Sequence, residues 1–92
     1  MDFEWDPDKA EANRRKHGVH FADGVGVFGD SSALTQEDPH PNEERWVTLG
    51  RDFLDGLVLV SWLWRGENIR LISARKATPR ERRQYTEGLN DA

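Results

Sequence analysis

The sequence predicts a small α+β domain with the element order β-α-α-β-β-β-β-α. Two observations lead to this class. Each end of the chain holds a proline-initiated helix start, Asp6-Pro7 and Thr78-Pro79, and four short apolar segments separated by turn sequences lie between them. Strands joined by short hairpins form an antiparallel meander, on which two N-terminal helices and one C-terminal helix pack. We expect residues 1–92 to form a single domain.

The N-terminal region predicts an edge strand followed by a helix. Residues 3–5 alternate in the way of a short strand. Asp6 is a good N-cap, and Pro7 suits the first helical position because its fixed backbone angle is already helical. The helix is therefore expected over 7–17, and Gly18 supplies the C-terminal cap.

A second, weaker helix is expected from His20 and Phe21 onward. Phe21, Val25 and Phe28 are spaced i, i+4 and i+7, which gives one buried stripe. Gly24 weakens the prediction, because glycine costs up to about 1 kcal/mol relative to alanine inside a helix.

Four further segments have the pattern of strands. The segment 57–64 is apolar on both faces, so it is expected to be a central strand, with Trp62 and Trp64 in the core. A hairpin loop at 52–56 precedes it, and a tight turn at 65–68 follows it. The predicted strands are 32–36, 44–51, 57–64 and 69–75.

The C-terminal helix has a clear start. Thr78 at the N-cap, Pro79 at the first position and Glu81 at the third form a capping box, so the helix is expected over 79–88.

Composition excludes several classes of protein. The chain has no cysteine, which rules out disulfides and thiolate metal sites, and its three histidines lack the spacing of a zinc site. We therefore expect no metal and no cofactor. No apolar run is long enough to span a membrane, and the acidic N-terminus does not look like a signal peptide, so a cytoplasmic protein is expected.

Charge is unevenly distributed along an acidic chain. The formal net charge is −4, which is unusual for a general nucleic-acid binder. Residues 21–44 nevertheless carry six acids and no Lys or Arg, whereas residues 65–83 carry seven cations and two acids. These blocks predict either one basic face that attracts an anion, or segments that neutralise each other across the fold.

The basic block between residues 70 and 83 is the candidate anion site. Arg75 and Lys76 at the strand end are the stronger candidates, because the helix cations that follow also suit a solvated surface. Arg70 and Arg75 have opposite strand parity, so they can share a sheet face only if the strand contains a bulge.

Two residues are candidates for proton transfer. His17 has a side chain of a type that titrates near neutrality, although a helix-end histidine hydrogen-bonded to Asn13 is the more ordinary explanation. Glu44, at the start of a strand, is either a base or the ion-pair partner of a neighbouring arginine.

Three blocks of the sequence together resemble the BrnT family, the toxins of type II toxin–antitoxin systems. The blocks are FEWDPDKAEANRRKHGV, DPHPNEERWVTLG and IRLISARKATPRERRQY. The resemblance implies a fold like that of RelE-type ribonucleases and cleavage of RNA that arrests translation. It also implies a hetero-oligomer with a BrnA antitoxin, whose ribbon-helix-helix region binds operator DNA. The toxin itself then touches that DNA only through the antitoxin, and no membrane is involved.

The chemistry implied by this resemblance needs no metal. A base removes the proton of the 2′-hydroxyl, cations stabilise the charged phosphorane, and an acid protonates the leaving oxygen. Arg70, Arg75 and Lys76 fit the cation role, and Glu44 or His17 fits the proton-transfer role. The residues expected to bind RNA are Arg51, Arg80 and Tyr85.

Two other functions remain compatible with the residues. One is a catalytically inactive module that binds the antitoxin and acts as a transcriptional co-repressor. The other is a small structural domain unrelated to toxins.

Overall fold

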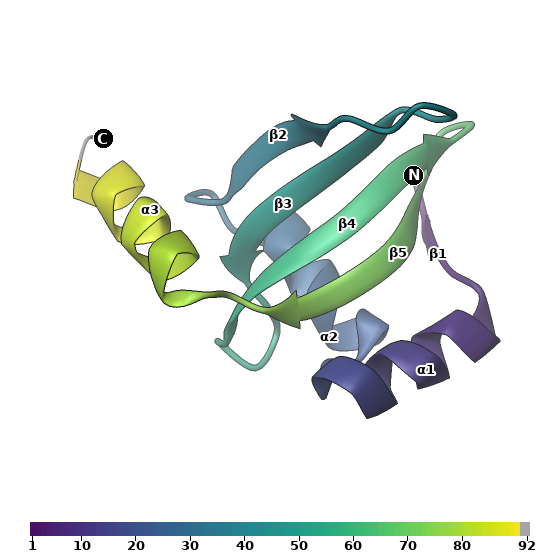
Figure 1. Cartoon of the computed structure of the whole chain (residues 1–92), viewed down its shortest axis with the longest axis horizontal. Coiled ribbons are helices and arrows are strands. Elements are labelled where there is room, and N and C mark those ends of the chain that lie inside the picture. The colour runs from purple at the N-terminus through teal and green to yellow at the C-terminus, as the bar shows by residue number, and fades with distance from the viewer. Residues whose placement is uncertain (91–92) are drawn as a thin grey trace.

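The computed structural model describes residues 1–90, which form a five-stranded sheet and three α-helices (Figure 1). The elements follow the predicted order, with a 3₁₀ turn added after the second helix. In chain order they are β1 (Phe3–Glu4), α1 (Pro7–His17), α2 (Phe21–Gly24), the 3₁₀ turn η1 (Val25–Gly29), β2 (Leu34–Asp38), β3 (Arg45–Arg51), β4 (Leu57–Arg65), β5 (Asn68–Lys76) and α3 (Pro79–Asn90).

Both predicted helix starts are confirmed in detail. The Asp6 carboxylate accepts a hydrogen bond from the backbone N–H of Asp8, and Gly18 ends α1 in the left-handed conformation with φ 73°. At α3, the Thr78 hydroxyl accepts from the N–H of Glu81, and the Glu81 carboxylate accepts in return from the N–H of Thr78. The two helices therefore begin where local hydrogen bonding alone directs them to begin.

The sheet has the strand order β1-β5-β4-β3-β2. Strands β2 to β5 form the predicted antiparallel meander, but β1 pairs with β5 in parallel, so the sheet is mixed. The prediction of a purely antiparallel sheet is wrong here, because no hairpin joins β1 to β5 and dictates their relative direction. Strand β2 also begins two residues later than predicted.

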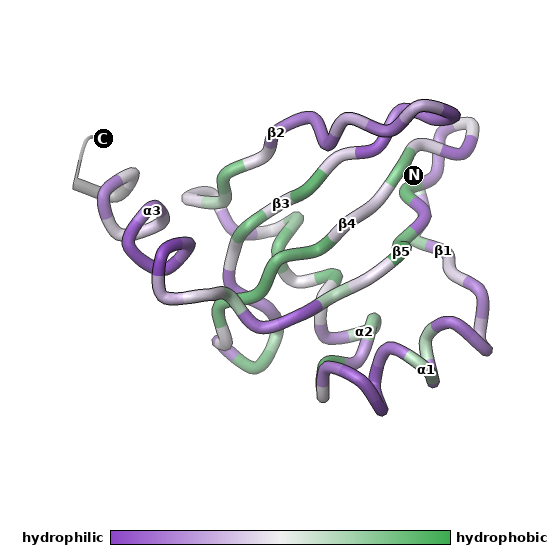
Figure 2. The backbone as a smooth tube through the Cα atoms, viewed as in Figure 1, coloured by the Kyte–Doolittle hydropathy of each residue, from purple (hydrophilic) through white to green (hydrophobic). Residues whose placement is uncertain are grey.

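The two faces of the sheet are covered differently (Figure 1). Helices α1 and α2 and the turn η1 pack on one face, here called the core face, while α3 covers only one end of the other, the open face. Apolar residues concentrate in the sheet and beneath α2, whereas α1 and α3 are mostly hydrophilic (Figure 2). The main core consists of Val19, Phe21, Val27, Val58, Val60, Trp62, Ile69, Leu71 and Ala74.

A β-bulge at Ile72 decides which face each side chain of β5 takes. Ser61 on β4 pairs with Ser73 and Trp62 pairs with Leu71, so Ile72 has no partner on β4. The extra residue reverses the alternation, and both Arg70 and Arg75 therefore point to the open face. The strand thus contains the bulge that Arg70 and Arg75 need in order to share a face.

Two predictions near the core need correction. Trp64, expected in the core, is 50% exposed: it lies near the end of β4, outside the core cluster, and its ring stands nearly perpendicular to that of Trp62. The second helix changes to a 3₁₀ turn at Val25. A Cβ at Gly26 would lie 2.5 Å from the backbone nitrogen of Phe53, so this turn needs glycine to let the β3–β4 hairpin approach.

The buried side chain of Asn13 replaces a strand partner at the edge of the sheet. Its amide nitrogen donates to the carbonyls of Ala74 and Val19 at 2.8 and 3.0 Å, and its oxygen accepts from the N–H of Ala74 at 3.0 Å. Strand β1 pairs only with Ile69 and Arg70, so Asn13 satisfies the backbone of β5 beyond it. This polar contact explains how a helix with little apolar surface docks on the sheet.

Candidate functional site

The predicted site residues lie at two opposite ends of the sheet. Arg51 faces Leu57 and Lys76 faces Val58 in the strand register, so Arg51 and Lys76 occupy the same end. We call it the α3 end, since α3 leaves the sheet there. The same end also holds Arg75, Arg80, Tyr85 and the C-terminus of α1 with His17.

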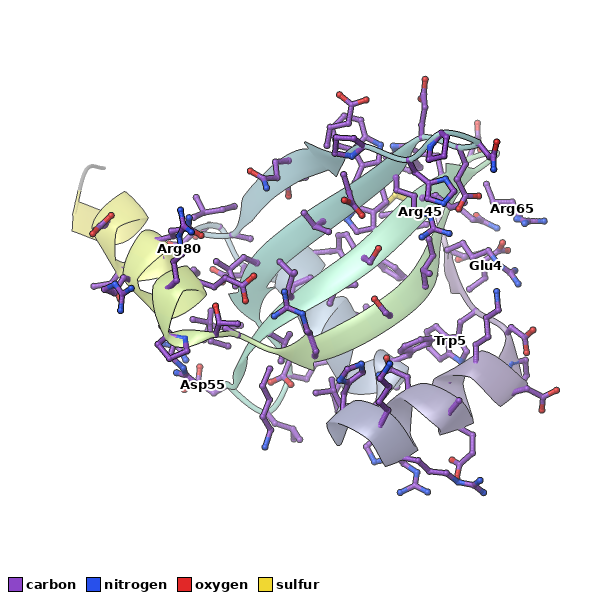
Figure 3. All side chains as sticks on the ribbon, in the orientation of Figure 1. Glu4, Trp5, Arg45, Asp55, Arg65 and Arg80 are labelled. Atoms are coloured by element: carbon purple, nitrogen blue, oxygen red, sulfur yellow. The ribbon has the colours of Figure 1, made fainter. Side chains whose placement is uncertain are left out.

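Arg70 and Glu44 lie at the other end. Arg70 pairs with Leu63, whose neighbour Trp62 pairs with Trp46, and Glu44 lies two residues before Trp46. Figure 3 shows this separation, with Arg45, Arg65 and Glu4 at one end of the sheet and Arg80 and Asp55 at the other. Arg70 and Arg75 are about 15 Å apart at the usual rise of a strand. They share a face but do not reach one phosphate together.

A cleft on the core-face side of the α3 end brings together cationic side chains and a histidine. It lies between the α1–α2 turn, the tip of the β3–β4 hairpin and the start of α3. Lys76, Arg82 and His20 line it, and Asp23 adds a carboxylate. We call it the end cleft. Its complete lining is Gly18, Val19, His20, Asp23, Asp52, Leu54, Gly56, Leu57, Val58, Lys76 and Arg82.

Arg75 points to the opposite face from Lys76 and is held by a carboxylate. Its guanidinium donates two hydrogen bonds to Glu81, at 2.7 and 3.0 Å. These bonds lower the pKa of Glu81 below its usual value and raise the pKa of Arg75. Arg75 therefore attaches α3 to the sheet, and the next residue, Lys76, lines the end cleft.

Tyr85 is a buried anchor of α3. Its ring is 5% exposed, the guanidinium of Arg51 lies 5.4 Å from the ring centroid, and its hydroxyl donates to Asp30 at 2.8 Å. Burial, with the hydrogen bond to the anionic Asp30, raises the pKa of Tyr85. Little of the ring is available to stack on a base.

Asp30 is the hub of this contact. Burial raises its pKa, but hydrogen bonds from the backbone of Arg51 and Ser32 and from the Tyr85 hydroxyl outweigh burial, so the net pKa lies below the usual value. The carboxylate is thus kept charged and holds the loop before β2, the end of β3 and α3 together.

The remaining predicted residues stand apart. Arg70 lies 3.4 Å from the Glu4 carboxylate, and Glu44 is exposed in the β2–β3 loop. His17 is half-buried at the end of α1, next to Gly18 of the end cleft, while Arg80 is exposed on α3. Within residues 1–90, no three side chains of His, Cys, Asp or Glu come together as metal ligands.

Sequence reasoning missed His20 and counted Arg82 only as part of the basic block, with a solvated helix surface as the alternative. Nothing local marks His20, because it looks like the residue before a weak helix. The fold, in which the β3–β4 hairpin approaches Gly26 closely, brings it into one cleft with Lys76 and Arg82, and all three side chains are exposed. The KHGVH run, which places two histidines around a helix end, is the one signal in the sequence.

A solved structure and a family model match this chain. The crystal structure of the Brucella abortus ribonuclease toxin BrnT matches with a TM-score of 0.65 and 28% sequence identity, covering 85% of this chain and 97% of that one. No curated protein matches. Within the part of the chain that the structure describes, no helix is long and apolar enough to cross a membrane. The family model described as "Ribonuclease toxin, BrnT, of type II toxin-antitoxin system" matches residues 5–81, and the chain therefore belongs to the BrnT family of type II toxin–antitoxin toxins.

Proposed function

We propose that this chain is a metal-independent endoribonuclease that arrests translation, and that its active site is the end cleft. The observation that carries this is the convergence of Lys76, Arg82 and His20 in one hollow at the end of β5. A histidine next to two cations is sufficient apparatus for cleaving RNA through its own 2′-hydroxyl.

The reaction assigns a role to each group. A neutral histidine takes the proton of the 2′-hydroxyl, and the freed oxygen attacks the neighbouring phosphorus. Lys76 and Arg82 stabilise the extra negative charge on the phosphorane oxygens. A protonated group then gives its proton to the leaving 5′-oxygen as that bond to phosphorus breaks. His20 lines the cleft, and only Gly18 and Val19 lie between His20 and His17 in the sequence. We assign the base and the acid to these two histidines.

The other predicted residues take supporting roles in this proposal. Arg51 and Arg80, at the same end, contact the flanking RNA backbone. Arg75 and Tyr85 position α3, and through it Arg82, rather than touch the reacting phosphate. Arg70 and Glu44 are too far away to join the chemistry and contact RNA only outside the cleft.

Family membership extends the proposal to partners and location. A type II toxin has an antitoxin, and we propose that this one is a BrnA-type ribbon-helix-helix protein that carries the complex to operator DNA. We also propose that the fold is like that of RelE-type ribonucleases and that the location is cytoplasmic. The gene adjoining the toxin gene tests the partner: the absence of a ribbon-helix-helix product there would contradict it.

The activity is tested with purified chain, radiolabelled RNA and excess EDTA, with and without ribosomes. Lys76→Ala and Arg82→Ala are each expected to slow cleavage about a hundredfold, the usual cost of losing one group that stabilises transition-state charge. Lys9→Ala and Arg83→Ala remove matched exposed cations elsewhere and are expected to leave the rate unchanged. Circular dichroism checks the fold of each variant.

The co-repressor alternative has one observation in its favour. Arg75 and Arg70 are already occupied by Glu81 and Glu4, which reduces the positive charge offered to RNA on the open face. Folded wild-type chain that cleaves no RNA under any of these conditions, and that does not arrest growth when expressed alone, would support this alternative and refute the enzyme.

A further inference from the structure

The outer edge of β2 is the uncovered edge of the described sheet. Strand β2 is last in the strand order, pairs only with β3, and is exposed at four of its five residues. The opposite edge offers little to pair with, since β1 has only two residues and Asn13 binds the backbone of Ala74 beyond it. Unpaired N–H and C=O groups of an edge are a template for another strand.

Strand β2 lacks most of the features that usually protect an edge. It contains no proline, lysine or bulge, and its register with β3 runs without a break from Leu34 to Asp38. Natural edge strands commonly carry such features to prevent pairing with other chains. A regular, open edge of this length is suited to bind an extended segment.

The side chains along this edge have a clear polarity. At one end, Leu34 is 40% exposed and borders a groove between the open face and α3, floored by Val47, Leu49 and Leu59. At the other end, Glu37 and Asp38 begin an acidic stretch. It continues in the β2–β3 loop with Glu43 and Glu44, which line a shared hollow with Glu37 and Asp38.

From this arrangement we propose that the β2 edge binds an extended, basic segment of the antitoxin, which adds a sixth strand to the sheet and places one apolar side chain in the groove beside Leu34. The proposal rests on the toxin–antitoxin function only for the identity of the partner. Backbone hydrogen bonds supply affinity, and the groove and the acidic stretch fix direction and register.

Charge selects this occupant over two others. RNA is disfavoured because Glu37, Asp38, Glu43 and Glu44 line one hollow at the end of this edge, where they repel phosphates. A second copy is disfavoured in either direction, because parallel pairing in register sets the two Glu37-Asp38 pairs side by side, and antiparallel pairing about Gln36 sets the apolar Leu34 opposite Asp38. A segment with Lys or Arg opposite Glu37 and Asp38 meets neither objection.

The test uses the full-length protein encoded by the gene adjoining the toxin gene, and overlapping peptides from it. Isothermal titration calorimetry compares wild-type chain with the double variant Glu37→Lys/Asp38→Lys. Asp2→Lys/Glu67→Lys is the control, because it makes the same change in net charge at exposed sites beside β1 and β5, away from β2. We expect the first variant to bind at least about tenfold more weakly and the control to bind as wild type does.

Hydrogen exchange gives an independent readout of strand addition. In the free chain, the alternate amides of residues 34–38 that face away from β3 should exchange rapidly, and binding should slow them without a change at the end cleft. Three results would overturn the proposal: no binding of the neighbouring gene product, equal affinity of the Glu37→Lys/Asp38→Lys variant, or unprotected β2 amides in the complex. The proposal would also be overturned if the β2 amides of the toxin alone became protected as its concentration rises, or on addition of RNA, because a second copy or RNA would then occupy the edge.

This outcome is separable from that of the ribonuclease test. Binding and exchange are measured without RNA, so an inactive chain that binds its antitoxin through β2 refutes the enzyme and retains the docking site. An active chain whose antitoxin leaves β2 unprotected does the reverse.

Discussion

Arg75 and Glu81 are joined by two hydrogen bonds of 2.7 and 3.0 Å, across the turn that separates β5 from α3. Glu81 also completes the capping box by accepting from the N–H of Thr78. One carboxylate therefore both starts the last helix and attaches it to the sheet. The position of Arg82, and so the geometry of the end cleft, depends on this pair.

The pair makes the free energy of unfolding depend on pH in the acidic range. The pKa of Glu81 is lowered in the folded chain, chiefly by Arg75, so its contribution is present above its usual value of 4.5 and is lost as pH falls below it. At neutral pH, Glu81→Gln is expected to lower the free energy of unfolding by about 1 kcal/mol, a modest amount because the pair is partly exposed.

Urea unfolding of both proteins between neutral pH and about pH 3 measures this effect. The difference between wild type and Glu81→Gln should shrink as pH falls. A difference that stays constant over this range would show that the carboxylate charge is not what stabilises α3.

Tyr85 provides a spectroscopic measure of how α3 docks. It is the only tyrosine in the chain, so the ultraviolet absorbance of tyrosinate reports it alone. Burial and the bond to Asp30 raise its pKa, and the midpoint in the folded chain should lie above the usual value of 10.0. Stability gained from this contact is complete below that value and declines as pH rises through the folded pKa.

Asp30→Asn serves as the comparison, because it removes the charge and keeps the shape. The tyrosine midpoint should then move down toward its usual value. An unchanged midpoint would mean that burial alone accounts for the shift.

Asn13→Ala should destabilise the fold more than any surface change on α1. It leaves the N–H and C=O of Ala74 and the carbonyl of Val19 without their partner in a buried place. We expect a loss of about 2–4 kcal/mol, since each unsatisfied buried group costs about 1–3 kcal/mol and water partly compensates. Thermal unfolding measures it, with Asn42→Ala in the exposed β2–β3 loop as the control. Equal melting temperatures for the two variants would contradict the role given to Asn13.

Gly26→Ala tests the close approach that encloses the end cleft. The added Cβ would lie 2.5 Å from the backbone nitrogen of Phe53, which cannot move as a flexible side chain can. We expect about 1–3 kcal/mol of destabilisation, the usual cost of overpacking. Gly29→Ala in the same turn meets nothing within 4 Å and should be neutral or slightly stabilising. Similar denaturation midpoints for both variants would show that the hairpin does not need this glycine.

Local patterns predicted the elements well because their causes are local. The Asp6 and Thr78 caps, Gly18 and the Asp55-Gly56 turn each act within a few residues, and the structure contains all of them. The faces of the sheet were harder to predict, because a single unpaired residue, Ile72, reverses the direction of every side chain after it.

The candidate site was predictable only in part for a related reason. Lys76 and Arg75 stand out in the sequence as cations at a strand end. Their separation to opposite faces follows from the alternation of side chains along a strand, but the meeting of Lys76 with His20 arises from contacts between residues distant in the chain. Such contacts leave no mark on the residues near either partner.

The dependence of the N-terminus on β5 also sets a time at which this chain can fold. Phe3 and Glu4 find their strand partner at Ile69 and Arg70, and Asn13 finds its partner at Ala74. A ribosome making the protein has therefore synthesised most of it before its first two elements can dock. The end cleft, which is bordered by that docked helix, forms only on a nearly complete chain. The ribonuclease activity proposed for the end cleft is therefore available only when synthesis is almost finished.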